Sequence, residues 1–187
     1  MSLDSHEFLI QQITQSHSFR RTHLMNSRDA IKVGLDMAEM ISLGYLEDLS
    51  DTELLHRPCA GANHINWQLG HIIVSENEIM NSAVPGSMPA LPSGLAEKYT
   101  KETASCDDPT KFSTKAELLK VYRDQRAATL VALSQLTDQD LDKESPENIR
   151  SYCPTLASAV SMQGSHWLMH AGQWVIVRRQ LGRAPLF

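Results

Sequence analysis

The sequence has few cysteines, no long hydrophobic run and no excess of basic residues. Its three cysteines, Cys59, Cys106 and Cys153, are odd in number and widely spaced. That usage favours reduced thiols in a cytoplasmic protein over a disulfide framework. No window holds about eighteen consecutive apolar residues, so we expect no membrane span. The net charge is −5, without a basic block, so nucleic acid is not an expected partner.

Strand-like alternation of apolar and polar residues is also missing, which leaves helices as the expected secondary structure. The first ten residues, MSLDSHEFLI, do not place a charged start before an apolar core, so we expect no signal peptide. A length of 187 residues with a hydrophobic share of 42% fits one globular domain.

Four long segments carry apolar residues at helical spacing. They cover approximately residues 28–49, 63–81, 115–136 and 156–181. Ser27, Thr114 (with Glu117) and Thr155 have the side chains and positions expected of N-caps. Four amphipathic helices of this length predict an all-α four-helix bundle.

The connections between these segments indicate how the bundle is joined. Residues 82–113 contain four prolines and therefore cannot form one helix, although a short helix is expected at 95–100. A connection this long predicts a functional cover or a crossover between the second and third helices. The similar phrases 49-LSDTELL-55 and 136-LTDQDL-141 suggest a duplicated helical hairpin. We divide the chain into an N-terminal arm, residues 1–26, and a bundle domain, residues 27–187.

Two histidines in the fourth segment, His166 and His170, share one face of a helix because they are four residues apart. Both fall in the apolar stripe, so their rings should point into the bundle, where an unpaired polar group is costly. A metal ion would satisfy both rings. Hydrogen bonds from each ring to a core acceptor are the alternative.

A third histidine, His71, lies in the middle of the second segment between apolar residues of the same face. If the inner faces of the second and fourth helices meet, His71 joins His166 and His170 in a three-nitrogen site. Three protein ligands leave coordination positions open, which is typical of a catalytic metal site. Three imidazoles suit zinc, nickel or iron, and ligand type alone does not choose among these metals.

The segments 63-NHINWQLGHIIVSE-76 and 166-HWLMHAGQWVIVRRQLGRAP-185 together resemble the DinB/YfiT-like superfamily of four-helix bundles, which are regarded as metal-dependent enzymes. The resemblance extends over about residues 28–185, so the arm lies outside it. It implies that His71, His166 and His170 are the metal ligands. It also implies a long crossover between helices two and three, and a homodimer.

Five further residues are candidates for the site. His64 is interpreted as a partner of a metal ligand, a proton shuttle or an exposed residue at a helix start. Glu76 is a possible general base or imidazole partner, or a surface carboxylate. Tyr122 faces inward and either bonds a substrate or belongs to the core. Gln173 and Arg178 match the family pattern and are candidates for cofactor binding or for a subunit interface.

A metal at such a site can activate water for hydrolysis or deprotonate a thiol. The resemblance favours the second chemistry, in which a low-molecular-weight thiol such as bacillithiol, mycothiol or glutathione reacts with a small-molecule substrate. A metal-dependent hydrolase is the alternative. A protein of another class, a non-catalytic metal-binding or stress-related bundle, would have its site closed by a fourth ligand such as His64 or Cys59.

Overall fold

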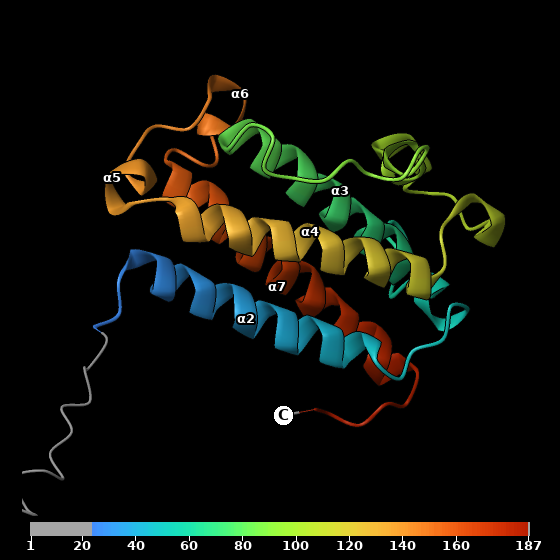
Figure 1. The fold of residues 1–187 in the computed structure, drawn as a ribbon. Coiled ribbons are helices and arrows are strands. Elements are labelled where there is room, and N and C mark those ends of the chain that lie inside the picture. The colour runs from blue at the N-terminus through green and yellow to red at the C-terminus, as the bar shows by residue number, and fades with distance from the viewer. Residues whose placement is uncertain (1–23, 187) are drawn as a thin grey trace, which may run out of the picture.

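The computed structural model describes residues 24–186, which form a bundle of four long helices without a strand (Figure 1). This confirms the predicted all-α four-helix bundle; most of the predicted arm, residues 1–23, lies outside the described residues. The long helices are α2 (Ser27–Leu46), α3 (Ile65–Ala83), α4 (Lys115–Gln135) and α7 (Leu156–Gln180). Short helices in the connections are η1 (Glu53–Leu55), η2 (Ala96–Tyr99), η3 (Lys101–Thr103), η4 (Pro109–Lys111), α5 (Asp138–Leu141) and α6 (Glu147–Arg150).

The starts of the long helices are fixed by side-chain caps. Thr114 and Thr155 cap α4 and α7, as the sequence predicts. The predicted cap of α2, Ser27, is wrong by one residue. Asn26 caps this helix instead, because its Oδ1 accepts from the backbone N–H of Asp29 at 3.0 Å. The Asp29 carboxylate accepts in return from the backbone N–H of Asn26, which completes a capping box.

The bundle does not run simply up and down. In Figure 1, α2 and α7 point in one direction and α3 and α4 in the opposite direction. The contacts agree, because α2 meets α7 near the start of the pair at Gly34 and Gly164 and near its end at Tyr45 and Arg178. A Cβ atom on Gly164 would lie 3.2 Å from the Gly34 carbonyl oxygen, so glycine permits this close parallel packing. The connection between α3 and α4 is therefore the crossover that the sequence predicts.

The crossover is fastened to the first half of α3. The ring of Tyr99 in η2 lies directly on the helix backbone at Gly70, where a Cβ atom would come within 2.3 Å of the ring. The Tyr99 hydroxyl donates to Asn66 Oδ1 at 3.3 Å. Trp67 Nε1 donates to the carbonyl oxygen of Thr100 at 3.1 Å. These contacts place η2 beside the first half of α3, where Gly70 directly precedes His71.

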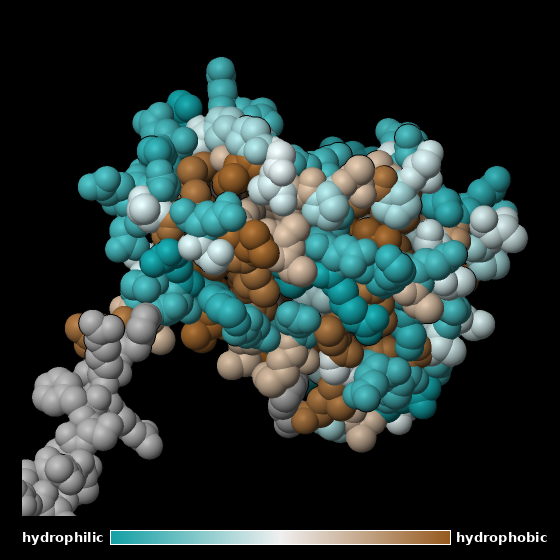
Figure 2. Space-filling model, viewed as in Figure 1, coloured by the Kyte–Doolittle hydropathy of each residue, from teal (hydrophilic) through white to brown (hydrophobic). Residues whose placement is uncertain are grey.

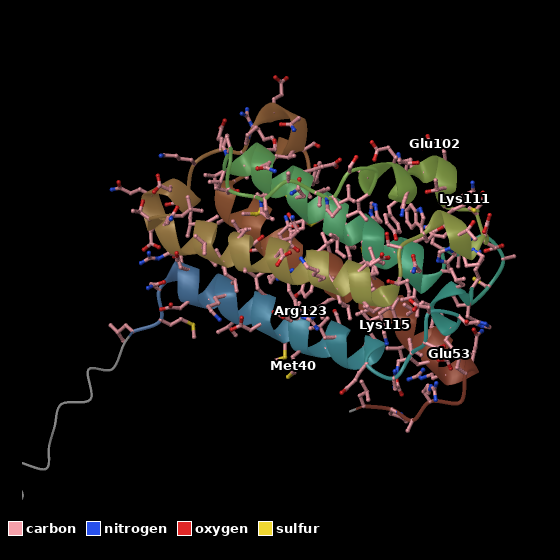
Figure 3. The ribbon with its side chains drawn as sticks, turned by 45° about the vertical axis from the view of Figure 1, so that its right-hand side comes forward. Met40, Glu53, Glu102, Lys111, Lys115 and Arg123 are labelled. Carbon is pink, nitrogen blue, oxygen red and sulfur yellow. The ribbon has the colours of Figure 1, made fainter. Side chains whose placement is uncertain are left out.

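Polar contacts close the end of the bundle where α2 stops. Lys115 Nζ donates to the carbonyl oxygens of Leu46 at 3.1 Å and Glu47 at 3.3 Å, and also to that of Leu49. The last turn of α2 has no basic residue, so Lys115 supplies the cation that a helix C-terminus favours (Figure 3).

Hydrophilic residues cover most of the face shown in Figure 2, and hydrophobic residues form separate clusters between them. No helix within residues 24–186 combines the length and the apolar character needed to cross a bilayer.

Candidate metal centre

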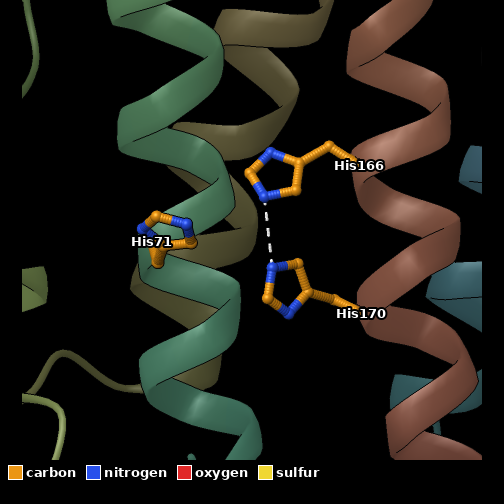
Figure 4. A group of neighbouring side chains, drawn as sticks. All are labelled: His71, His166 and His170. Carbon is orange, nitrogen blue, oxygen red and sulfur yellow. Dashed lines mark hydrogen bonds between the residues drawn. The ribbon is translucent and has the colours of Figure 1, made fainter. Parts of the chain in front are cut away.

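Three imidazole rings converge between α3 and α7 (Figure 4). His71 projects from α3, and His166 and His170 project from successive turns of α7. Each ring offers a nitrogen atom, and the three atoms lie within 4.8 Å of one another. The Nε2 atoms of His166 and His170 are 3.2 Å apart. Two ligands of a tetrahedral zinc ion would be about 3.3 Å apart, given metal–nitrogen distances of about 2.0–2.1 Å. The donor set and its spacing therefore fit one divalent metal ion.

The position of each ring follows from its helix. His166 and His170 are four residues apart on α7, so both face α3. His71 is held from the other side by Trp67, whose ring stacks on the imidazole with centroids 5.0 Å apart and planes 7° apart. The inner faces of α3 and α7 meet, and the spacing of the histidines along these helices brings the three rings together.

Burial keeps the three rings neutral. His166 and His170 are 7% and 8% exposed, and His71 is half-buried. Loss of hydration lowers the pKa of His71. It lowers the pKa of His166 to about 4 and that of His170 to about 3, with a smaller contribution from neighbouring imidazoles. Neutral imidazole is the form that binds a metal, so the site is ready at neutral pH without losing protons to the solvent.

The Nδ1 atoms of His166 and His170 differ in their hydrogen bonding. Nδ1 of His166 has no hydrogen-bond partner among the described residues. Nδ1 of His170 lies 2.9 Å from Oε1 of Gln68, a residue that the sequence analysis did not single out. Nothing in the local sequence marks Gln68, because its side-chain partners lie on a helix about a hundred residues later.

The histidines open into a cavity of about 670 Å³. Its apolar wall is formed by Trp67, Val74 and Met169, and the crossover supplies a polar wall around Thr100. Its charged lining residues are Glu78, Glu97 and Lys101, all of them exposed. A cavity of this size is typical of a site for a small molecule.

His64 is neither exposed nor free to bind an ion. Its side chain is fully buried and caps α3, with Nδ1 accepting from the backbone N–H of Trp67 at 3.0 Å. Its Nε2 therefore carries the proton and donates to the carbonyl oxygen of Cys106 at 3.1 Å. Both nitrogens are used by the backbone, so the structure assigns His64 to the helix start and to anchoring the crossover. Cys59, the other candidate for closing the site, is exposed and outside the histidine cluster.

Glu76 lies away from the histidines, in a buried ion pair. Its Oε2 is 2.9 Å from Arg126 Nη2 and accepts from Trp167 Nε1 at 3.3 Å, while its Oε1 accepts from the Thr129 hydroxyl at 2.7 Å. With its oxygens bonded in the core, the carboxylate is not placed to take a proton from a substrate in the cavity. The Tyr122 ring packs against the Trp167 ring, with centroids 4.3 Å apart, and Tyr122 does not line the cavity.

The remaining two candidates have defined partners. Gln173 Oε1 accepts from Gln68 Nε2 at 3.2 Å, which places it one contact away from His170. Arg178 lies in the last turn of α7. It donates to the Tyr45 carbonyl oxygen at 2.8 Å and pairs with the Asp48 carboxylate. This ion pair holds the pKa of Asp48 below its ordinary value.

The chain belongs to the DinB superfamily, whose family model matches residues 35–174. A conserved protein from Enterococcus faecalis has the same fold, with a TM-score of 0.62 and 18% identity over 85% of this chain and 99% of that chain. YfiT from Bacillus subtilis is similar as well, with a TM-score of 0.56 and 18% identity over 84% of this chain and 89% of its own. YfiT is described as a probable metal-dependent hydrolase with an unusual four-helix bundle topology. No match was found among curated proteins. The predicted family is thus confirmed.

Proposed function

We propose that this protein is a metal-dependent enzyme acting on a small molecule at the histidine cluster. One observation carries the proposal: three neutral imidazoles meet at the wall of an open cavity, and no other histidine, cysteine or carboxylate of residues 24–186 joins them. A structural metal site would be closed by a fourth protein ligand. This arrangement favours catalysis over the non-catalytic metal-binding alternative.

His71, His166 and His170 would hold the ion. A divalent metal bound there would supply Lewis acidity that lowers the pKa of a coordinated thiol or water. The imidazoles bring no charge of their own, so the full positive charge of the ion would act on the ligand in the cavity. Trp67 and Met169 would shield that end of the cavity from bulk water.

We favour a low-molecular-weight thiol as the nucleophile, in an S-transferase-like reaction. A metal lowers the pKa of its bound water to about 7, and a general base beside the metal accelerates hydrolysis further. Glu76 is committed to Arg126, and Glu78 follows His71 by seven residues, about 10 Å along the helix. A thiol ionises far more readily than water and needs no such base. The cavity volume of about 670 Å³ also leaves room for a thiol together with an electrophile.

A metal-dependent hydrolase is the second candidate, and the description of YfiT favours it. In that case Glu78 and Glu97, which line the same cavity, would be the carboxylates available to take a proton from the reacting water.

Cobalt(II) loading followed by thiol addition separates these candidates. Glutathione, bacillithiol and mycothiol are added in turn to the cobalt-loaded protein, with S-methylglutathione and the His166→Ala variant as controls. We expect one thiol to produce a sulfur-to-cobalt charge-transfer band that both controls lack. Cobalt binding without such a band for any thiol would contradict the transferase proposal, and turnover of ester or amide substrates by the same protein would favour the hydrolase.

A further inference from the structure

We propose that Gln68 is the residue that orients His170 for metal binding, an inference that rests on the proposed metal site. Gln68 lies in the first turns of α3 and is 1% exposed. Its side chain crosses to α7 and reaches between His170 and Trp174, which are four residues apart there. Its Oε1 is 2.9 Å from His170 Nδ1 and 2.9 Å from Trp174 Nε1.

The orientation of the Gln68 amide follows from two neighbouring groups, one of which can only donate a hydrogen bond and the other only accept one. An indole N–H can only donate, so the Gln68 atom that faces Trp174 must be the oxygen. A backbone carbonyl can only accept, and the carbonyl oxygen of Asn63 lies 2.7 Å from the other end of the amide, which must be the nitrogen. Gln173 Oε1 accepts a second hydrogen bond from that nitrogen.

The tautomer of His170 follows. Since Gln68 Oε1 is an acceptor, Nδ1 of neutral His170 carries the proton and donates to it. The Nε2 atom of His170 then holds a lone pair, and it is the atom that faces His166 at 3.2 Å. Gln68 therefore fixes both the ring angle and the proton position that a ligand needs. Hydrogen-bonded partners of this kind typically change metal affinity about 10–100-fold when removed.

His166 has no such support. Without a metal, its Nε2 must donate to the lone pair of His170 Nε2, which leaves its buried Nδ1 without a partner in the described part of the chain. The site is thus asymmetric, because Gln68 fixes the orientation of His170, whereas no side chain within residues 24–186 bonds to Nδ1 of His166. Gln173 and Asn63 contribute indirectly, because they hold the Gln68 amide in place.

Two substitutions test this role. Gln68→Met keeps the volume but removes the acceptor. Gln68→Glu keeps an oxygen acceptor for His170 and Trp174 but loses the donor to Asn63 and Gln173. Gln125→Met is the matched control, because Gln125 is equally buried on α4 but bonds to Asn77 and the Pro89 carbonyl oxygen, away from the histidines. The tautomer of His170 is read from nitrogen-15 chemical shifts and long-range couplings of the metal-free proteins. Zinc affinity is measured by competition with a chelator.

The expected result is an Nδ1–H tautomer for His170 in the wild type, Gln68→Glu and Gln125→Met, and its loss in Gln68→Met. Zinc affinity should fall about 10–100-fold in Gln68→Met, fall less in Gln68→Glu, and stay within a few-fold of wild type in Gln125→Met. An Nε2–H tautomer in the wild type, or unchanged affinity in Gln68→Met, would overturn the inference. Absence of zinc binding to a wild type that shows the expected tautomer would instead refute the proposed metal site.

Discussion

Replacing Glu76 with methionine tests whether this carboxylate serves the fold or the chemistry. The substitution keeps a similar volume but leaves the Arg126 guanidinium buried, at 3% exposure, without its counter-charge. It also removes the acceptor for Thr129 and Trp167. Breaking one side of a buried ion pair costs about 3–5 kcal/mol. The free energy of unfolding should fall by that amount.

Urea unfolding of the metal-free protein measures this loss. With a slope of about 2 kcal/mol per molar urea, the midpoint should drop by about 1.5–2.5 M at unchanged slope. The double variant Glu76→Met with Arg126→Met should recover most of the loss, because a buried ion pair can be replaced by packed apolar side chains. Zinc affinity of the folded protein should be unchanged in both variants. A shift below about 0.5 M, or loss of zinc binding with normal stability, would refute the structural assignment of Glu76.

Three other perturbations have defined outcomes. Gly70→Ala would place a Cβ atom 2.3 Å from the Tyr99 ring, so the crossover must shift, and we expect a cost of about 1–3 kcal/mol in urea unfolding together with faster tryptic cleavage in the crossover. Burial lowers the pKa of His166 from 6.5 to about 4 and that of His170 from 6.5 to about 3, so protons bind these side chains more tightly in the unfolded chain. The metal-free protein should keep its full stability above about pH 7.5 and lose about 2 kcal/mol for each of the two residues by pH 5, and a flat profile of urea midpoint against pH would contradict this. Arg178→Ala should lower the free energy of unfolding by about 1.5–3 kcal/mol, because its bonds to Asp48 are lost, and should leave zinc affinity unchanged. Weaker zinc binding with normal stability would instead show that Arg178 acts in the metal site.

Residues that act within one helix were predictable from the sequence. The four long helices, the caps at Thr114 and Thr155 and the shared face of His166 and His170 all follow from spacing of three or four residues. The prediction that His71 lies next to that pair rested on two further observations. These are the inward-facing apolar stripe of the second helix and the family resemblance. Both rest on patterns that a single sequence displays.

Residues whose role depends on a distant partner were not predictable in the same way. Glu76 shares the helical stripe of α3, but its partner Arg126 comes 50 residues later, so sequence alone could not separate a general base from an ion pair. His64 precedes α3 at the cap position, where serine, threonine, aspartate and asparagine are the usual signals, and histidine gives no warning there. Gln68 is an ordinary helical residue until α7 is placed beside it.

The metal content of the untagged protein, measured per chain after purification, tests the central claim most directly. Three proteins are compared: the wild type, His166→Ala, and His56→Ala, whose imidazole bonds to Gln180 on the surface. We predict about one equivalent of a divalent metal in the wild type and in His56→Ala, and its loss in His166→Ala. A wild type that holds no metal, even after zinc, nickel or iron is supplied, would contradict the account and leave the three histidines as core packing.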